Sequence, residues 1–422
     1  MDLGDVANPG AAGYGKPLDG VRILAAEQMQ ALPYATQLLA RLGAEVVKVE
    51  HPTAGESGRG SFPAMLDPEG RRVGATFVRN NLNKRSVGID LKQPEGRDLF
   101  LRLVPRFDVV CENFKAGTMD RLGLGYDVLA ERNPRVIHLS LSGFGNAGTP
   151  GDDDGASPYQ GWPAYASIVE AMSGIYAYRQ EPGRRPRANP VGALGDISSA
   201  LFGTIGILAA LRHRDRTGEG QRIDVAMLDA VLAMTDIVTN LWSMGVHGSV
   251  EEAVSAILDT FAASDGWFVL QAVRPHQFTR LAEVIGRAEW LDDPRFATPA
   301  GYVAHLDDEV RPAIEAWAAK MTKQEASAAL SAAGLTAGPC LTPPEVIDDP
   351  HVAARHMLVA LPRSDDVAEP VLIPGNPVKM SKVAEGPETR IPWLGEHTDE
   401  VLRAELDLDD ADLAALREHG TI

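Results

Sequence analysis

An aspartate that opens a predicted helix is the strongest candidate for chemistry in this sequence. Gly195-Asp196 directly precedes the apolar run Ile197–Phe202, which is typical of a buried helix. Free N–H groups and the helix dipole stabilise an ionised carboxylate at such a position. An ionised, accessible carboxylate can act as a covalent nucleophile, and Gly195 would allow a ligand or a second backbone to approach it closely. Aspartate is also a favoured N-cap, and this stretch by itself favours that structural role.

The segment Gly143–Gly148 matches the pattern GxGxxG and follows a predicted strand. A dinucleotide site also needs a helix that begins on these glycines, so that its N-terminus faces the pyrophosphate. Here Thr149-Pro150-Gly151 and three aspartates follow, which interrupt a helix and repel phosphate. We therefore interpret the glycines as a structural turn and keep a nicotinamide-dependent oxidoreductase as an alternative.

Other catalytic and metal-binding patterns are missing from the sequence. Asp152–Asp154 resembles the start of a calcium loop but lacks a glutamate at the twelfth position. The 10 histidines form no HExxH or HxH pattern, and His351 and His356 are five residues apart, so we predict no metal site. There is no GxSxG and no P-loop pattern. Cys111 lies in an apolar segment, which favours a buried hydrophobic role.

Strand and helix patterns alternate along the first 145 residues, and these elements form the framework that positions the candidate residues. A strand, a helix and a second strand within some 30 residues form a βαβ unit and imply a parallel pair. The alternation then repeats, which predicts a doubly wound α/β layer. The expected strands are 21–24, 44–50, 86–91, 108–112 and 136–141, and the expected helices are 31–42, 95–103 and 119–132.

Beyond residue 145 the pattern changes to loops, long apolar helices and a second, smaller domain. Turn-forming residues predict loops at 146–163 and 181–189. We divide the chain into a flexible tail (1–16), the N-terminal part of a large α/β domain (17–225), a linker helix (226–245), a smaller α+β domain (246–345) and a return segment (346–422).

Composition narrows the possible partners. The chain has 422 residues, 45% hydrophobic and 23% charged, as in folded globular proteins. Its 58 acidic against 40 basic side chains give a net charge of −18, which repels nucleic acid and anionic lipid. The longest apolar stretch, 200–211, is shorter than a membrane span, the N-terminus has no signal-peptide pattern, and 2 cysteines make no disulfide framework. We expect a soluble cytoplasmic protein with no nucleic-acid or membrane partner.

Several segments, in the same order, resemble the class III CoA-transferase family (CaiB/BaiF-like), which includes formyl-CoA transferases, carnitine CoA-transferases and methylacyl-CoA racemases. The resemblance covers residues 17 to about 405, and its most specific segment is 216–230, RTGEGQRIDVAMLDA. The other segments are 17–24, 42–52, 83–86, 112–117, 133–137 and 394–398. The resemblance implies a large Rossmann-like domain completed by the C-terminal segment, a smaller inserted α+β domain, and two chains interlocked as a homodimer.

In this family the nucleophile is the aspartate of a Gly-Asp pair that opens a helix, and Asp196 matches it. The resemblance therefore implies a catalytic role for Asp196. Its carboxylate attacks the acyl-CoA donor to give a mixed anhydride, the released thiolate converts this into an aspartyl-CoA thioester, and the acceptor acid finally takes the CoA. Coenzyme A thioesters are then substrates, and no tightly bound cofactor is expected.

The resemblance also implies a set of residues that bind coenzyme A. Lysine and arginine suit its phosphates because they donate charge-assisted hydrogen bonds. The matching positions are Gln30 and Ala31 after the first strand, Lys92 near the nucleotide, Asn113, Phe114 and Lys115 at the adenine and phosphates, and Arg121 just beyond them.

Some positions depart from the family pattern. His51 stands where an arginine is common. Ala166 stands near the acidic residue that assists the nucleophile in formyl-CoA transferases, and Tyr165 and Ala166 replace the His-Asp pair of the racemases. Neither is a general base near neutral pH. A glycine-rich lid of formyl-CoA transferases is missing between 245 and 262, so formate and oxalate are not implied as substrates.

The sequence thus predicts a CoA-transferase that moves CoA from an acyl-CoA to a carboxylic acid, with Asp196 as the covalent nucleophile. An acyl-CoA racemase or isomerase acting at the α-carbon is the alternative on the same scaffold. A CoA-binding protein without activity is a further one. The identities of the acyl group and the acceptor acid stay open at this point.

Overall fold

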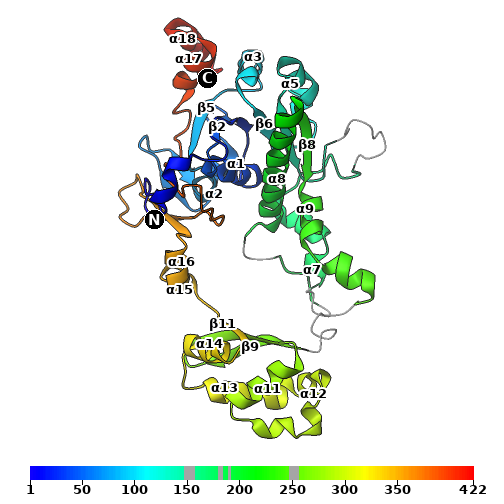
Figure 1. Ribbon diagram of the computed structural model, residues 1–422. Helices are drawn as coiled ribbons and strands as arrows, with labels where there is room; N and C mark the ends of the chain where they lie inside the picture. The colour runs from blue at the N-terminus through cyan, green and yellow to red at the C-terminus, as the bar shows by residue number, and fades with distance from the viewer. Residues whose placement is uncertain (147–156, 179–183, 189–191, 247–255) are drawn as a thin grey trace. The chain divides into compact units, whose positions relative to one another are not determined.

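The computed structural model describes residues 1–146, 157–178, 184–188, 192–246 and 256–422. The chain forms two compact units (Figure 1). The first comprises Met1–Thr235 and Pro350–Ile422, and the second comprises Asp236–Asp349. The first unit is therefore built from two stretches that lie far apart in the sequence.

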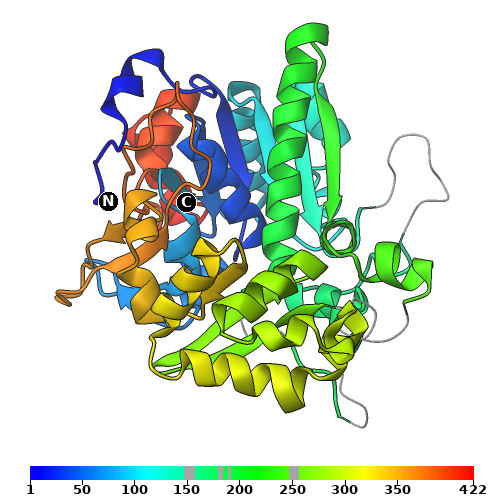
Figure 2. The same ribbon diagram turned by 60° about the horizontal axis from the view of Figure 1, so that its bottom comes forward.

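A six-stranded parallel sheet forms the centre of the first unit (Figures 1 and 2). Its strand order is β5-β2-β1-β6-β7-β8, and every neighbouring pair is parallel. The strands are β1 (Arg22–Ala26), β2 (Glu45–Glu50), β5 (Lys84–Gly88), β6 (Val109–Glu112), β7 (Ile137–Ser142) and β8 (Gln221–Ala226). The predicted α/β class with a parallel central sheet is confirmed.

The direction of the strand order reverses between β1 and β6. From β1 the chain moves outward through β2 to β5, and it then crosses back to β6 on the other side of β1. The connections that follow β1 and β6 leave in opposite directions, which opens a crevice at the carboxyl ends of these strands. Ligands of open α/β sheets bind in this crevice, so the loops that begin at Glu27 and Asn113 are the expected place for a site.

Helices pack on both faces of this sheet. They are α1 (Ala31–Arg41), α3 (Pro94–Leu103), α5 (Tyr126–Arg132), α8 (Leu194–Thr217), α17 (Thr398–Leu406) and α18 (Asp410–Glu418). Successive strand residues point to opposite faces, so the neighbours Ile23 and Leu24 of β1 belong to two different buried clusters. The first cluster includes Ile207 of α8, and the second includes Leu402 of α17. Burial from both sides explains why β1 and β6 are apolar at most positions.

Residues 1–16, predicted to form a flexible tail, instead make specific contacts with the return segment. The Met1 ammonium donates to the carbonyl oxygen of Leu358 (3.2 Å), and the side chain of Asn8 donates to the carbonyl oxygen of Val383 (2.9 Å). The sequence did not indicate these contacts, because the partners of this glycine-rich stretch lie 357 and 375 residues later, beyond any local pattern.

The return segment also covers the edge strand β5. The N–H of Gly88 donates to Oγ1 of Thr398 (3.0 Å), and the N–H of His397 donates to the carbonyl oxygen of Ser86 (2.9 Å). These bonds satisfy groups that an exposed edge would leave unpaired. Earlier in the segment lie α16 (Pro350–Ala354) and the hairpin of β12 (Leu358–Leu361) and β13 (Val371–Pro374). One hydrophobic cluster joins this hairpin to β3 (Ala64–Leu66), β4 (Arg72–Gly74) and α2 (Ala75–Asn80).

The predicted linker helix 226–245 is broken in the structure. α9 (Met227–Met234) ends because Thr235 adopts an extended conformation (φ −112°, ψ 143°), which suits a β-branched residue. A π-helix, Ile237–Leu241, and a short 3-10 helix, Trp242–Met244, follow. The boundary between the two units falls at this break.

The second unit is an antiparallel sheet packed against helices. Its strand order is β11-β10-β9, and its core includes the stacked rings of Phe278 and Tyr302, with centroids 4.2 Å apart. The elements are β9 (Ile257–Ala263), β10 (Gly266–Ala272), β11 (Thr336–Pro339), α11 (Pro275–Val284), α12 (Pro299–Ala304), α13 (Arg311–Ala318), α14 (Lys323–Ala332) and α15 (Pro343–Ile347). One face of this antiparallel sheet packs against the helices and the other is more exposed, which produces the alternating burial seen in β10.

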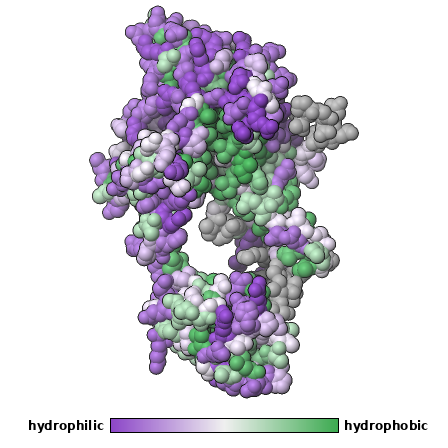
Figure 3. Space-filling view, in the orientation of Figure 1, coloured by the Kyte–Doolittle hydropathy of each residue, from purple (hydrophilic) through white to green (hydrophobic). Residues whose placement is uncertain are grey.

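α8 has 24 residues and is long and apolar enough to cross a membrane on length and composition alone. It is the one such helix within the described residues. Half of its most apolar window is buried, and core helices of globular proteins meet the same criterion. Its outer side exposes Leu201, Phe202, Ile205 and Leu208. Figure 3 shows hydrophobic residues gathered on this part of the first unit.

Candidate active site

Asp196 lies in the first turn of α8, at the third helical position rather than at the cap. The N-cap position is Ala193, and a helical backbone bond runs from the N–H of Ile197 to the carbonyl oxygen of Ala193 (2.9 Å). The structural role considered for Asp196, an N-cap, is therefore wrong. Its carboxylate lies at the positive end of the helix dipole, as the nucleophile hypothesis requires.

Gly195 allows a second helix, α6 (Ala166–Met172), to approach the start of α8. An added Cβ at Gly195 would lie 2.7 Å from Cγ2 of Val169 and 3.0 Å from Cα of Ala166. Both distances are shorter than van der Waals contact between carbon atoms, so a side chain here would push α6 away. Of the two approaches that the sequence left open for Gly195, the second backbone is the one observed.

The carboxylate of Asp196 is half-buried and has a perturbed pKa. Desolvation and, second, the Glu170 carboxylate raise this pKa to about 6, and the Arg79 guanidinium opposes the rise. Within the part of the chain that the structure describes, no hydrogen bond reaches its side-chain oxygens. A carboxyl with a pKa near 6 is mostly ionised at neutral pH and has free lone pairs, which suits nucleophilic attack.

Glu170 is a buried carboxylate that the sequence analysis missed. Its Oε1 accepts the N–H of Gly195 (3.2 Å), and its Oε2 accepts the hydroxyl of Tyr176 (2.7 Å) at the start of α7 (Ile175–Tyr178). It follows Ala166 by one helical turn of α6, on the same face. The helical period of about 3.6 residues was the available signal, because it points from position 166 to position 170.

A pocket of about 200 Å³ opens beside Asp196. Three loops that follow β1, β6 and β7 supply much of its wall, so it lies at the crevice that the strand order creates. The lining residues include Gln28, Met29 and Ala31, then 113–116, 141–143 and 162–165, and finally Gln160, Asp196 and Met227.

The side chain of Asn113 ties the loops after β1 and β6 together. Its Oδ1 accepts the N–H of Gln28 (2.8 Å), and its Nδ2 donates to the carbonyl oxygen of Gln28 (2.9 Å). At the end of β6, the Glu112 carboxylate accepts the N–H of Phe114 (2.8 Å) and fixes the next turn. Burial raises the pKa of Glu112 to about 7. Asn113, predicted to contact coenzyme A, thus also links the two loops that border the crevice.

Four of the positions predicted to bind coenzyme A line this pocket together with Asp196, namely Ala31, Asn113, Phe114 and Lys115. Lys115 is exposed, whereas Ala31 is buried at the start of α1. The pocket therefore brings these residues together from three segments of the chain, and more than 80 positions separate each segment from the next. Ligand sites at the crevice of an open α/β sheet are built in this way.

The other three predicted positions lie outside the pocket lining. Gln30 directly precedes α1 as its N-cap residue. Lys92 is exposed just before α3. Arg121 is exposed at the end of α4 (Thr118–Arg121), where it donates to Oγ1 of Thr118 (2.8 Å). Their roles in binding coenzyme A stay predictions.

Ser142 is a further pocket residue that the sequence analysis did not single out. It ends β7, is 5% exposed, and its Oγ has no hydrogen-bond partner within the described residues. Buried hydroxyls are normally bonded, so the hydrogen-bonding capacity of this one is unused within the described residues. The signal for it was its place at the carboxyl end of a predicted strand.

A cluster of buried opposite charges holds the loop after β1. Nζ of Lys84 donates to Oε1 of Glu27 (2.6 Å), and Nζ of Lys48 donates to the carbonyl oxygen of Glu27 (3.1 Å). Glu56 lies 3.6 Å from Nζ of Lys48 and accepts the N–H of Met29 (2.8 Å). Desolvation raises the pKa of Glu27, but Lys84 and Lys48 outweigh it and the net shift is downward. Desolvation lowers the pKa of Lys84 to about 8.

The GxGxxG glycines follow β7, whereas a dinucleotide site uses the turn after the first strand. An added Cβ at Gly143 would lie 2.2 Å from Cβ of Ala164, so close packing accounts for this glycine. The turn after β1, Glu27-Gln28-Met29, contains no glycine. Gly148 and Asp152–Asp154 lie outside the described residues. The placement of the glycines thus favours a structural turn over a nicotinamide site.

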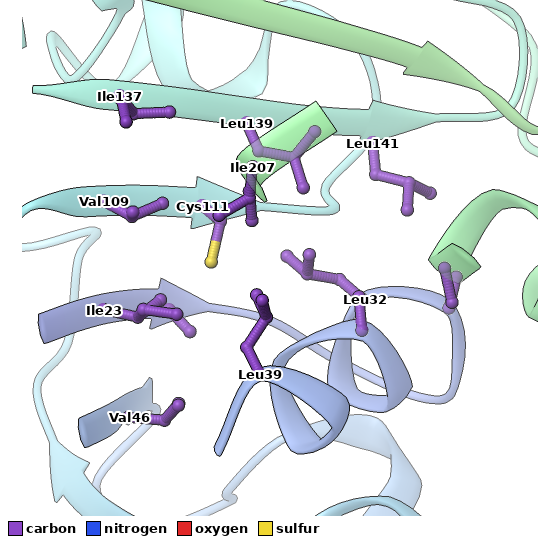
Figure 4. Close-up of a cluster of buried hydrophobic side chains, with 14 of the residues drawn as sticks. Ile23, Leu32, Leu39, Val46, Val109, Cys111, Ile137, Leu139, Leu141 and Ile207 are labelled. Atoms are coloured by element: carbon purple, nitrogen blue, oxygen red, sulfur yellow. The ribbon is translucent and has the colours of Figure 1, made fainter. Parts of the chain in front are cut away.

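Cys111 is buried in β6 among apolar side chains (Figure 4), and burial raises the pKa of its thiol well above the usual value. Its Sγ lies 3.9 Å from the carbonyl oxygen of Leu24. His51, at the position of the missing arginine, is exposed, and its Nδ1 accepts the N–H groups of Thr53 and Ala54 (3.3 Å each). Cys111 is thus a core residue and His51 caps a surface turn.

Among the described residues, one group of side chains brings enough ligand atoms together for a metal ion, namely His305, Asp308 and Glu309. Nδ1 of His305 is 3.3 Å from Asp308, and Glu309 forms an ion pair with Arg295. Acidic residues of helices commonly gather in this way on solvated surfaces. The group receives no functional assignment.

Comparison with known proteins gives matches over nearly the whole chain. The family described as CoA-transferase family III matches residues 18–398. The β subunit of succinyl-CoA–L-malate CoA-transferase from Chloroflexus aurantiacus is 34% identical over 412 residues, which cover 96% of this chain and 98% of that protein. The succinate–glutarate CoA-transferase of Agrobacterium fabrum is 36% identical over 93% of this chain and 96% of its own. The formyl-CoA:oxalate CoA-transferase of Streptomyces avermitilis is 34% identical over 96% of this chain and 100% of that protein.

Solved structures give the same result. A CaiB/BaiF family protein from Brucella suis matches with a TM-score of 0.78 and 34% identity, covering 93% of this chain and 100% of that chain. Rv3272 from Mycobacterium tuberculosis matches with a TM-score of 0.76 and 30% identity. The match covers 91% of this chain and 99% of that chain.

Proposed function

Because the chain belongs to CoA-transferase family III, we propose that it moves CoA from an acyl-CoA donor to a carboxylic acid through covalent intermediates on Asp196. The transferase class follows from the family and from the named relatives. The covalent route rests on one observation: a half-buried carboxylate without a hydrogen-bond partner among the described residues lies in the first turn of α8 and lines a pocket of about 200 Å³.

In the first half of the proposed reaction, the Asp196 carboxylate attacks the thioester carbonyl carbon of the donor. The C–S bond breaks, CoA leaves as a thiolate, and the acyl group remains on Asp196 as a mixed anhydride. The thiolate then attacks the aspartyl carbonyl carbon, which releases the donor acid as a carboxylate and leaves an aspartyl-CoA thioester. One difficult exchange is thus divided into easier acyl transfers.

In the second half, the acceptor carboxylate attacks the carbonyl carbon of aspartyl-CoA and displaces the CoA thiolate. The thiolate attacks the acceptor carbonyl carbon of the new anhydride, which forms the acceptor acyl-CoA and restores the Asp196 carboxylate. Each tetrahedral intermediate carries an oxyanion that needs hydrogen-bond donors. The N–H of Asp196 and the hydroxyl of Ser142 are the donors we propose, because both residues line the pocket.

We assign coenzyme A binding to the loops after β1 and β6. Ala31 and Phe114 offer apolar contacts in the pocket, and Lys115 offers an exposed ammonium to a phosphate. Replacing Lys115 by alanine should raise the KM for acyl-CoA about ten-fold with little change in kcat, because a charge-assisted hydrogen bond is lost equally in the ground and transition states. An unchanged KM would contradict this placement.

Chemical trapping tests the covalent route. The protein is incubated with succinyl-CoA, quenched with hydroxylamine and mapped by mass spectrometry. A hydroxamate is expected at Asp196, because hydroxylamine attacks both an aspartyl anhydride and an aspartyl thioester. Asp196→Asn should abolish both the label and CoA exchange.

Asp229→Asn is the matched control for this experiment. Asp229 also lies in the first turn of a helix, α9, and desolvation also raises its pKa, but it lies outside the pocket lining. This variant should keep the label and the activity. A label elsewhere, together with full turnover of Asp196→Asn, would refute the assignment.

We propose a dicarboxylic acid as the acceptor. The activities named for the relatives involve malate, glutarate and oxalate, each of which carries two carboxyl groups. A panel of succinyl-CoA with dicarboxylic and monocarboxylic acids, analysed by chromatography of the thioesters, tests this. The racemase alternative instead predicts deuterium exchange at the α-carbon without any acceptor, although Tyr165 and Ala166 offer no base for it.

We also propose that two chains form an interlocked homodimer. Leu201, Phe202, Ile205 and Leu208 are spaced to share one face of α8, and all four are exposed. Exposed apolar groups that gather in this way mark contact surfaces. Light scattering should give the mass of a dimer, and Ile205→Asp should weaken it. A fully active monomer would contradict this proposal.

A further inference from the structure

Two acidic side chains approach each other at the start of α8. The negative charge of Glu170, on α6, acts directly on Asp196 and raises its pKa. The approach of α6 is close, since an added Cβ at Gly195 would lie 2.7 Å from Cγ2 of Val169. Glu170 itself is 3% exposed. Burying a charge beside a like charge is unfavourable, so packing alone does not account for a carboxylate at this position.

Glu170 also holds the turn that carries Asp196. Its Oε1 accepts the N–H of Gly195 (3.2 Å), the residue directly before Asp196, and its Oε2 accepts the hydroxyl of Tyr176 (2.7 Å). Both oxygens accept hydrogen bonds, which is the arrangement of an ionised carboxylate. A neutral amide of the same shape could form the same two bonds. What only the carboxylate adds is negative charge next to Asp196.

We propose that Glu170 is a positioning residue of the active site, which fixes the first turn of α8 and uses its charge to keep Asp196 a strong nucleophile. This inference rests on the proposed role of Asp196. The charged groups that act on Asp196 are Glu170 from α6 and Arg79 from α2, with opposite effects, and the pocket lining adds Lys115 from the turn after β6. Raising the basicity of an attacking group raises its intrinsic nucleophilicity, so Glu170 compensates for the pull of Arg79.

Glu170→Gln separates the charge from the hydrogen bonds. The glutamine carbonyl can still accept the Gly195 N–H, and its amide can donate to the oxygen of Tyr176. The acid limb of kcat/KM reports the ionisation of Asp196 in the free enzyme, and it should shift by about one pH unit to lower pH. At pH 8 the rate should fall about three-fold, because Asp196 is then a weaker base. The substrates titrate identically with both enzymes, so a shift belongs to the protein.

Glu170→Asp is the matched control, because it keeps the charge and shortens the side chain. Its acid limb should stay near that of the parent enzyme, while kcat falls because the bond to Gly195 is lengthened. An acid limb that does not move in Glu170→Gln would overturn the proposal and leave Glu170 a purely structural role. Failure of Glu170→Gln to fold would also overturn it, because the carboxylate would then be needed for folding.

The trapping experiment distinguishes this failure from a failure of the proposed function. If the hydroxamate forms at Asp196 but Glu170→Gln leaves the acid limb in place, only the role of Glu170 is refuted. If the parent enzyme gives no hydroxamate at Asp196, the covalent route itself is refuted.

Discussion

Two groups of charges in the first unit are built in opposite ways. Around Glu27, the ammonium groups of Lys84 and Lys48 lie 2.6 and 3.5 Å from Oε1, and the pKa of this carboxyl is lowered despite its burial. Around Asp196, burial and the like charge of Glu170 act together and raise the pKa to about 6. The first group stabilises the ionised form of Glu27, and the second destabilises the ionised form of Asp196.

This difference separates a carboxylate that holds the fold from one that can react. Both oxygens of Glu27 are bonded, Oε1 to Lys84 and Oε2 to the hydroxyl of Thr36 (2.7 Å), so its lone pairs are engaged. The carboxylate of Asp196 has no such partner within the described residues and lines a pocket. Groups whose environment works against their charged form gather at functional sites, and this comparison favours Asp196 over Glu27.

The largest effect is expected when the paired cluster is broken. Lys84→Met leaves Glu27 buried with Lys48 as its remaining nearby cation, and the free energy of unfolding at pH 7 should fall by about 3 kcal/mol. Urea unfolding measures this. Lys92→Met removes an exposed lysine and should change stability by less than about 0.5 kcal/mol. If the two variants were equally stable, Lys84 would not be holding the fold.

A smaller loss is expected when the two helices that meet beside Asp196 are forced apart. In Gly195→Ala the new methyl group would lie 2.7 Å from Val169 and 3.0 Å from the backbone of Ala166. Stability should fall by about 2 kcal/mol, and activity should fall because Glu170 moves away from Asp196. Gly338→Ala adds a methyl group where no atom lies within 4 Å and is the control. Normal activity of Gly195→Ala would show that the close approach of α6 is not needed.

Removing the unfavourable charge should have the opposite effect on stability. The pKa of Asp196 in the folded protein, about 6, exceeds its ordinary value of 3.8. Protonated Asp196 therefore stabilises the fold at low pH, and this contribution is lost as the pH rises from about 4 through 6. The free energy of unfolding of Asp196→Asn, measured relative to that of the parent protein, should rise by about 1 kcal/mol between pH 4 and pH 7. This figure allows for solvent screening. A difference in unfolding free energy that stays constant over this range would contradict the raised pKa.

The smallest effect is expected from Arg79, whose charge opposes that of Glu170. Arg79→Gln should raise the pKa of Asp196 further, and the acid limb of kcat/KM should move to higher pH by about half a unit. The direction is opposite to that expected for Glu170→Gln. Arg72→Gln, at an exposed arginine of β4, serves as the control. A shift of Arg79→Gln to lower pH would show that the two charges do not oppose each other at Asp196.

Local patterns predicted the elements of the first unit well. The strand expected at 108–112 is β6 (Val109–Glu112), and the helix expected at 31–42 is α1 (Ala31–Arg41). Apolar runs with the period of a buried strand or a helix suffice for this, because burial acts on each element separately. The pattern was not enough at 226–245, where one extended residue, Thr235, interrupts an otherwise helical stretch.

The candidate site was predictable only in part. Asp196 was singled out as the candidate nucleophile because Gly195-Asp196 has a distinctive place before an apolar helix and in a family pattern. Glu170 was missed because helical spacing relates it only to position 166, whereas its contact with Gly195 depends on α6 packing against α8. Ser142 was missed because serine is common at strand ends, and only the pocket distinguishes this one.

By itself the sequence determined the class of fold, five of the six strands of the central sheet in chain order, the family and a candidate for the reactive carboxylate, because these follow from residue types and local patterns. The tertiary structure decided the rest. It folded the first 16 residues onto the return segment, joined the loops after β1 and β6 through Asn113, and brought Glu170 to Asp196. These depend on long-range contacts, and the electrostatic energy of a charge is set by which groups surround it in space and not by its neighbours in the chain.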